Sequence, residues 1–232
     1  MTSTRGLPLP EGEEKLRAVR SLFDTISGRY DLVNRVMTFG MDVGWRRRAV
    51  RELRLPGGAL ILDLACGTGD LCSELQRNGY RTVGFDFSWG MLTAATTSAP
   101  LVQADVLQLP LPDASADGAT CGFALRNVVD LGAFFAELGR VVRPTGRIAL
   151  LDASEPDRGV MRAGHGAYFR HVVPWIGGLL SNASAYAYLP RSMAYLPPPL
   201  EMVSMLRDAG FPDAVRHQLS GGITQLLAGT RT

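Results

Sequence analysis

The chain has 232 residues, of which 46% are hydrophobic and 20% are charged, and its formal net charge is +2. This length and composition are typical of one soluble α/β domain, and they exclude a disordered chain and a partner attracted by overall charge. Three cysteines without a CxxC spacing and three scattered histidines predict neither a disulfide framework nor a metal site. With no signal peptide and no apolar run of 18 residues, we expect a cytoplasmic protein.

Helices are expected before the first strand. Apolar residues recur at helical spacing over residues 13–27, a second periodic stretch runs through Leu32, Val36 and Phe39, and a third helix covers residues 42–53. We expect residues 1–57 to form a helical cap over the mouth of a pocket in residues 58–232, within one structural domain.

Strands and helices then alternate along the chain. The apolar runs that predict strands cover residues 59–62, 81–86, 101–104, 118–123, 147–152, 215–219 and 223–229. Alternation at this spacing is typical of right-handed parallel crossovers, and the last two runs form a hairpin. The expected fold is therefore a doubly wound, mostly parallel seven-stranded α/β sheet. Residues 155–200, which are rich in aromatic residues and proline, are expected to form an insertion over the sheet edge.

A glycine turn follows the first predicted strand, with the sequence Asp-Leu-Ala-Cys-Gly-Thr-Gly-Asp from Asp63 to Asp70. A dinucleotide fingerprint would place a third glycine where this chain has Cys72, and two carboxylates would repel a diphosphate. The ammonium and the sulfonium of S-adenosylmethionine (SAM) suit these carboxylates. The turn therefore predicts a SAM-dependent methyltransferase.

Acidic residues also end the next two strands. Ligands of an open parallel sheet lie beyond the carboxyl ends of its strands, so Asp86 is placed for the ribose hydroxyls and Asp105 for the adenine amine. The backbone N–H of Val106 is a further adenine contact. The methionine part would be surrounded by Asp63, Gly67, Thr68 and Gly69. An NAD-type oxidoreductase is the alternative, because Asp86 would serve it equally well.

The segment from Gly122 to Val128 follows the fourth parallel strand, where the transferred methyl group should lie. An Arg126–Asn127 pair can bind a substrate oxygen and stabilise a developing phenolate. The alternative is that Asn127 caps a helix and Arg126 lies on the surface. Composition alone leaves both interpretations open.

Several motifs together resemble one family. They are the glycine turn, the Leu-Arg-Asn-Val sequence at 125–128, the Tyr-Asp-x-x-Asn sequence at 30–34 and the Tyr-x-Tyr-Leu-x-x-Ser sequence at 186–192. In these the chain is similar to the quinone-biosynthesis C-methyltransferases, which include the demethylmenaquinone and 2-polyprenyl-benzoquinol methyltransferases. The resemblance covers roughly residues 20–230. It implies SAM contacts at Thr68, Asp86, Asp105, Val106 and Gly122. Gly122 stands where the family often has serine, and Leu196 stands where phenylalanine is common.

The resemblance implies methylation of the ring of a reduced prenylated quinone, with demethylmenaquinol as the main expectation and another small aromatic molecule as the alternative. The candidates for accepting the proton or stabilising the oxyanion are Arg126, Tyr30 and Asp31, with His165 and His171 as further alternatives. Arginine stays protonated, so Arg126 is expected to act through its position and charge.

One apolar segment and one arginine-rich segment suggest which partners the chain could contact. Residues 172–180 are apolar but too short to span a bilayer, so they would line a groove for a prenyl tail, contact the membrane surface or pack on the sheet. Five arginines between Arg46 and Arg54 would face lipid headgroups or nucleic acid, or form a solvated helix face. Because aromatic residues other than Trp45 are not interleaved with them, no nucleic-acid partner is expected. The oligomeric state stays open, with a homodimer as one alternative.

Overall fold

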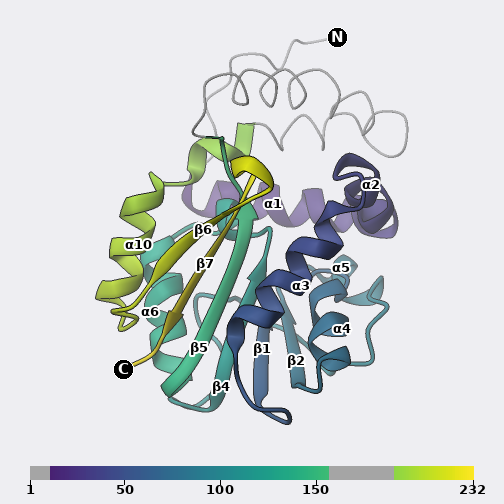
Figure 1. Cartoon of the computed structure of the whole chain (residues 1–232). Helices are drawn as coiled ribbons and strands as arrows, with labels where there is room; N and C mark the ends of the chain where they lie inside the picture. Colours follow the sequence, from purple (N-terminus) through teal and green to yellow (C-terminus); the bar gives the residue numbers. More distant parts are fainter. Residues whose placement is uncertain (1–10, 157–190) are drawn as a thin grey trace.

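The structure of the chain, a computed structural model, describes residues 11–156 and 191–232. Within these residues one sheet has the strand order β3-β2-β1-β4-β5-β7-β6 (Figure 1). Its strands are β1 (Leu60–Leu64), β2 (Arg81–Asp86), β3 (Leu101–Gln103), β4 (Ala116–Gly122), β5 (Val142–Ala153), β6 (Val215–Leu219) and β7 (Thr224–Thr230). β7 pairs antiparallel with β5 and β6, whereas the other pairs are parallel. The predicted doubly wound sheet with a closing hairpin is confirmed.

Helices flank the sheet and cover its upper edge in Figure 1. The α-helices are α1 (Gly12–Ile26), α2 (Tyr30–Met37), α3 (Met41–Leu53), α4 (Asp70–Arg77), α5 (Trp89–Thr93), α6 (Leu131–Val141) and α10 (Pro199–Asp208). Short 3-10 turns are η1 (Ser27–Arg29), η2 (Leu125–Asn127), η4 (Met193–Tyr195) and η5 (Ser220–Gly222).

Two apolar clusters, one on each face of the sheet, make up most of the core. On one face, Trp45 and Leu53 of α3 and Leu75 of α4 pack against strand residues such as Ile61 and Leu151. The other face carries α6 and α10, whose buried residues include Phe134, Phe135 and Leu206. Because both faces are covered, the parallel strands are apolar along their length, as is usual for such sheets. α3 therefore packs as part of the sheet's helical layer, and the domain boundary at residue 57 stays a prediction.

Helices α1 and α2 lie across the carboxyl ends of the strands. Asp24 of α1 accepts hydrogen bonds from the hydroxyl of Ser88 at 2.5 Å and from the N–H of Gly90 at 3.0 Å. Ile26 and Val33 pack on Met91 of α5. These contacts fix the two helices above the sheet edge where the strand-end acids lie.

The second periodic stretch is largely a helix, but the apolar residues that predicted it are exposed. Leu32, Val36 and Phe39 are 57%, 39% and 75% exposed, while Val33 is fully buried. Apolar residues occur on two faces of this helix, so periodicity alone did not distinguish them. The expected insertion lies largely outside the described residues, as do His165, His171 and the 172–180 segment.

Candidate functional site

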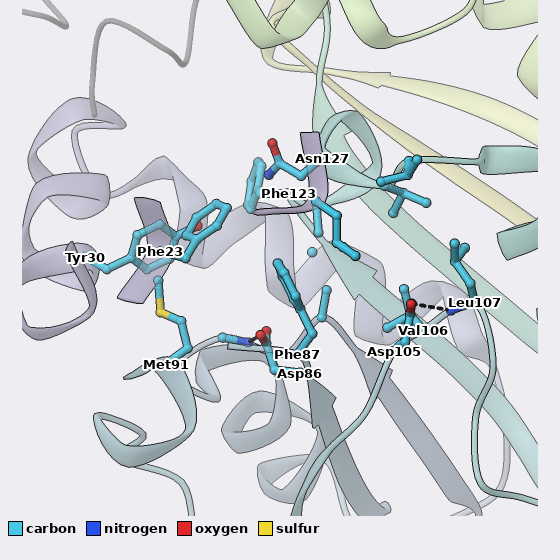
Figure 2. Close-up of a pocket in the computed structure, with 17 residues that line it drawn as sticks. Phe23, Tyr30, Asp86, Phe87, Met91, Asp105, Val106, Leu107, Phe123 and Asn127 are labelled. Atoms are coloured by element: carbon cyan, nitrogen blue, oxygen red, sulfur yellow. Dashed lines mark hydrogen bonds between the residues drawn. The ribbon is translucent and has the colours of Figure 1, made fainter. Parts of the chain in front are cut away.

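A largely apolar pocket opens between the helical cap and the carboxyl ends of β1, β2 and β4 (Figure 2). Its empty space is about 700 Å³ when the part open to solvent is counted. The cap contributes Leu16, Phe23 and Tyr30, and Figure 2 shows the last two extending toward the strand ends. The sheet side contributes Asp86, Phe87, Asp105, Val106, Phe123 and Asn127.

A smaller, polar pocket shares part of this wall. Tyr30, Ala65, Gly67 and Gly122 line both pockets, so the two adjoin at these residues. The polar pocket adds Arg46, Asp63, Cys66, Thr68, Asp70 and Leu71. One region of the site is therefore apolar and aromatic, and the neighbouring region carries charges of both signs.

The glycine turn brings the backbone to the pocket wall. Gly67 has a φ of +56° and Gly69 a φ of +84°, conformations that favour glycine. A Cβ at position 69 would overlap the side chain of Thr97, whereas a Cβ at position 67 would meet no heavy atom within 4 Å. Gly67 therefore leaves open space where a ligand can approach the main chain.

The acids that end β2 and follow β3 lie in the apolar pocket, as the sequence predicted. Asp86 accepts hydrogen bonds from the N–H groups of Gly67 and Ser88, both at 2.8 Å. Burial raises the pKa of Asp86, and these N–H groups oppose the rise. Asp105 is exposed and accepts from the N–H of Leu107 at 2.9 Å. Each carboxylate oxygen has more than one acceptor site, so both residues can still bind a ligand.

Asp63, at the end of β1, lies in the polar pocket and is almost completely buried. It accepts hydrogen bonds from the hydroxyl of Thr120 at 2.8 Å and from the thiol of Cys72 at 3.2 Å. Burial raises its pKa to about 6, although these hydrogen bonds and the charge of Arg46 oppose the rise. Cys72, the residue in the third fingerprint position, thus positions the strand-end acid.

Tyr30 and Asn127 line the apolar pocket, whereas Arg126 and Asp31 do not belong to the lining of either pocket. Burial raises the pKa of Tyr30, and the charge of Arg126 and a hydrogen bond with Asn34 oppose the rise. Tyr30 is therefore a neutral phenol near pH 7, which is able to donate a hydrogen bond.

Arg126 lies behind the pocket wall in a buried ion pair with Asp152, whose side chain is fully buried at the end of β5. Asp152 also accepts a hydrogen bond from the backbone N–H of Arg126 at 3.0 Å. The interpretation of Arg126 as a surface residue is wrong, because the buried carboxylate requires a partner of opposite charge. The interpretation of Asn127 as a helix cap is also wrong, since Asp130 caps α6 by accepting from Ala133.

Asp31 tethers the cap to the glycine turn. Its carboxylate accepts a hydrogen bond from the hydroxyl of Thr68 at 2.6 Å, and burial raises its pKa. The structure thus joins the Tyr-Asp-x-x-Asn sequence to the glycine turn, although Asp31 and Thr68 are 37 residues apart.

Arg46 is a charged residue of the polar pocket that was not among the predicted site residues. It is 8% exposed, while its neighbour Arg47 points to solvent. Arginine clusters usually form solvated faces, which concealed this residue in the sequence. Asp42, four residues earlier on the same helix face, is a signal that could have indicated a buried partner.

The donors and acceptors of the site fit SAM. Two strand-end acids beside an apolar pocket suit a nucleoside, and a neighbouring pocket with both signs of charge suits an amino-acid group. The carboxylates of Asp63, Asp70 and Asp86 would disfavour a diphosphate. The fold and the site therefore define a class I SAM-dependent methyltransferase.

Solved structures with this fold include a SAM-dependent methyltransferase of Thermotoga maritima described as a possible histamine N-methyltransferase. The two share 18% sequence identity and a TM-score of 0.66, over 92% of this chain and 100% of that one. A SAM-dependent methyltransferase of Aquifex aeolicus has 17% identity and a TM-score of 0.59, over 83% of this chain and 92% of that one. At these identities the similarity supports the fold.

The ubiE/COQ5 methyltransferase family matches residues 11–231, and the chain belongs to this family. It is 40% identical to the demethylmenaquinone methyltransferase of Deinococcus radiodurans, with all of both chains covered. It is also 40% identical to a ubiquinone/menaquinone biosynthesis C-methyltransferase, UbiE, of Syntrophotalea carbinolica, over 92% of this chain and 94% of that one. The family resemblance predicted from the sequence is confirmed, and membership of a methyltransferase family replaces the oxidoreductase alternative.

Among the helices of residues 11–156 and 191–232, none combines the length and the apolar character needed to cross a membrane.

Proposed function

We propose that the chain methylates a ring carbon of a reduced prenylated quinone, with demethylmenaquinol as its substrate and SAM as the methyl donor. The observation that carries this proposal is the apolar, aromatic pocket that adjoins the polar pocket at Tyr30 and Gly122. An aromatic ring held beside Tyr30 and Asn127 would lie next to the donor, whose nucleoside would occupy the part of the same pocket lined by Asp86 and Asp105. The relatives from Deinococcus radiodurans and Thermus thermophilus, named demethylmenaquinone methyltransferases, support the naphthoquinol as the substrate.

Residues of both pockets would contact the methyl donor. Asp86 would accept hydrogen bonds from the ribose hydroxyls, and Asp105 with the N–H of Val106 would bind the adenine. Asp63, Gly67, Thr68 and Gly69 would surround the methionine part. When bound, SAM supplies an electrophilic methyl group on a sulfonium. Gly122 would face both the donor and the ring.

The hydroquinone has to lose a hydroxyl proton so that its ring carbon becomes nucleophilic, and the protein has to stabilise the phenolate that results. Tyr30 and Asn127 would donate hydrogen bonds to the substrate oxygen from the pocket wall. The charge of Arg126, which already acts on Tyr30, would favour the phenolate from behind this wall. Because Tyr30 is neutral near pH 7, the proton goes to water or to a carboxylate, and Asp31 is the candidate carboxylate.

A panel of reduced quinones with radiolabelled SAM tests the substrate. Naphthoquinols and benzoquinols should be compared with the same prenyl tail, and each with and without that tail. We expect label in the naphthoquinol ring, and faster turnover with the tail than without it. Label in the benzoquinol ring alone would contradict the naphthoquinol as substrate, and no label in any of these quinols would contradict the quinone class.

We also propose peripheral contact with a membrane surface, because a prenylated substrate partitions into the bilayer. The exposed apolar residues Leu32, Val36 and Phe39 of the α2 region and the exposed arginines Arg47 and Arg51 of α3 support this contact. Co-sedimentation with anionic vesicles tests it. Leu32→Ser with Phe39→Ser should reduce the bound fraction, and an unchanged fraction would exclude this surface.

A further inference from the structure

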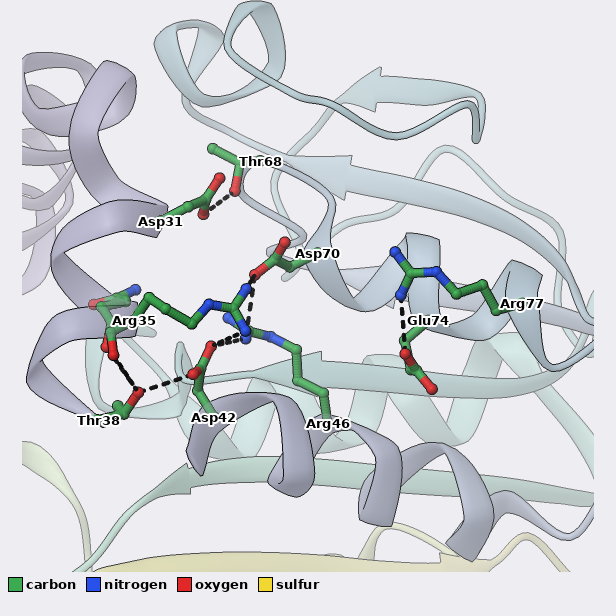
Figure 3. Close-up of polar contacts among 10 residues, drawn as sticks. Asp31, Arg35, Thr38, Asp42, Arg46, Thr68, Asp70, Glu74 and Arg77 are labelled. Carbon is green, nitrogen blue, oxygen red and sulfur yellow. Dashed lines mark hydrogen bonds and ion pairs between the residues drawn. The ribbon is translucent and has the colours of Figure 1, made fainter. Parts of the chain in front are cut away.

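Arg46 is held in place by a compact network of charges at the edge of the polar pocket (Figure 3). Its Nη1 forms ion pairs with Asp42 and, at 3.2 Å, with Asp70. Arg35 contacts the same two carboxylates, each at 3.4 Å. Thr38 adds a hydrogen bond to Asp42 at 2.8 Å. Two guanidinium groups and two carboxylates thus fix the position of Arg46 while balancing their charges.

The network leaves part of the guanidinium of Arg46 available. Arginine has five N–H donors in a planar fork that matches a carboxylate. Both ion pairs of Arg46 use Nη1, and in the described part of the chain neither Nε nor Nη2 meets an acceptor. The residue is nevertheless 8% exposed and lines the pocket. A buried guanidinium with donors to spare at a pocket wall is suited to bind an anionic group of a ligand.

The polar pocket carries a charge of each sign from two different elements. Asp63 ends β1, and Arg46 comes from α3, close enough for its charge to lower the pKa of Asp63. A ligand with only a positive charge would be repelled by Arg46, and a ligand with only a negative charge would be repelled by Asp63 and Asp70. A free α-amino acid group carries both charges and matches the pocket.

We propose that Arg46 binds the α-carboxylate of the methionyl part of SAM. This inference rests on the proposed function and adds a binding residue to it. Asp42 and Asp70 orient the guanidinium, and its Cζ lies 5.8 Å from the centroid of the Phe123 ring. The amino-terminal helices thereby contribute directly to binding of the methyl donor.

Binding of two ligands that differ only in this carboxylate tests the proposal. SAM and decarboxylated SAM are titrated by calorimetry against the wild-type protein, Arg46→Met and the neighbouring control Arg47→Met. We expect Arg46→Met to weaken SAM by roughly 10- to 100-fold, the range for a lost charged hydrogen bond. Decarboxylated SAM, which carries only positive charge, should bind the same variant at least as tightly as it binds the wild type, and Arg47→Met should change neither ligand.

The outcomes separate this inference from the proposed function. Equal weakening of both ligands by Arg46→Met would overturn it, because the residue would then act only on the fold of the site. Unchanged SAM affinity would overturn it as well. Failure of the wild-type protein to bind SAM would instead contradict the proposed function.

Loss of Arg46 removes one partner of the buried carboxylate of Asp42, so two further variants guard against misfolding. Asp42→Asn combined with Arg46→Met relieves that charge and should show the same selective loss of SAM. Arg46→Lys keeps the charge but loses the planar fork, and should weaken SAM by roughly 3- to 10-fold. Decarboxylated SAM should bind this variant as it binds the wild type.

Discussion

At the scale of single residues, the buried carboxylate of Asp63 should make both the stability of the fold and the affinity for SAM depend on pH. Its pKa is raised to about 6 in the folded chain, so the unfolded chain releases this proton at lower pH. The stability that it contributes is therefore complete below about pH 4 and is lost as the pH rises through 6. The rise corresponds to at most about 3 kcal/mol in the free energy of unfolding.

Denaturant unfolding of the wild type and of Asp63→Asn between pH 4 and 7 measures this effect. We expect the difference in the free energy of unfolding between the two proteins to change across that window. As the pH rises, the wild type should lose stability relative to the variant. A constant difference would show that Asp63 titrates normally. SAM affinity should also weaken as the pH falls below 6 in the wild type, because the negative charge is lost.

Gly122, which differs from the serine common in the family, has room for a side chain. A Cβ there would contact only the Cδ2 of Leu71, at 3.4 Å, and the position lines both pockets. Gly122→Ser should leave the thermal unfolding temperature nearly unchanged and strengthen SAM binding about 5-fold, as one added hydrogen bond allows. The control Gly69→Ser should lose binding, since its backbone is left-handed and Thr97 fills the space. Weaker binding by Gly122→Ser would show that the hydroxyl has no acceptor in the ligand.

Arg126 should affect catalysis without affecting donor binding. It lies outside both pocket linings but its charge acts on Tyr30, so Arg126→Met should lower kcat on the order of 100-fold and leave the Kd for SAM within about 2-fold. Combining it with Asp152→Asn avoids leaving a buried charge without its partner. Stopped-flow turnover and calorimetry provide the two readouts. An unchanged kcat in the double variant would remove Arg126 from the mechanism.

At the scale of elements, the sequence predicted which segments are helical better than it predicted which face is buried. Periodicity placed α2 and α3 correctly, but Leu32 and Phe39 face solvent and Arg46 faces the site. The choice of face depends on what each helix packs against, and those partners are distant in sequence. Arg126 illustrates the same limit, because its partner Asp152 lies 26 residues away on strand β5.

Helix α1 is held by a buried lysine, which is unusual for a cap helix. Lys15 donates to the carbonyl of Val128 at 2.7 Å, and its Nζ lies 3.8 Å from the ring centroid of Tyr195. Burial lowers its pKa to about 8. Three separate elements around the apolar pocket, α1, the segment after η2 and η4, therefore meet at this side chain.

Lys15→Met should loosen α1, because the hydrogen bond and the cation–π contact together contribute about 1–2 kcal/mol. Hydrogen exchange of residues 12–26 should become faster, with β1 and β4 unchanged. The wild type, but not the variant, should gain stability between about pH 8 and 10.5, since the unfolded chain holds the lysine proton more tightly there. Equal exchange rates in α1 would mean that its other contacts suffice.

At the scale of the whole molecule, parallel strands explain why the acids that line the two pockets could be predicted from the sequence. Strands that run in the same direction end at one edge, so the acids at the carboxyl ends of β1, β2 and β3 lie along that edge. Asp63, Asp86 and Asp105 all line the pockets as expected. The contribution of the cap could not be derived in this way, because no periodicity specifies that Asp31 binds Thr68 or that Tyr30 lines both pockets.

The site is thus shared between two parts of the fold, and donor binding should stabilise both at once. SAM at 100 times its Kd should raise the free energy of unfolding by about 2.7 kcal/mol. Hydrogen exchange should slow in α1 and α2 as well as in the glycine turn, because Tyr30 and Gly67 line the same pockets. Asp86→Ala should abolish protection in both parts at the same SAM concentration. Protection confined to the glycine turn would mean that the cap does not contact the donor, and would leave α1 and α2 with a role in binding the quinol alone.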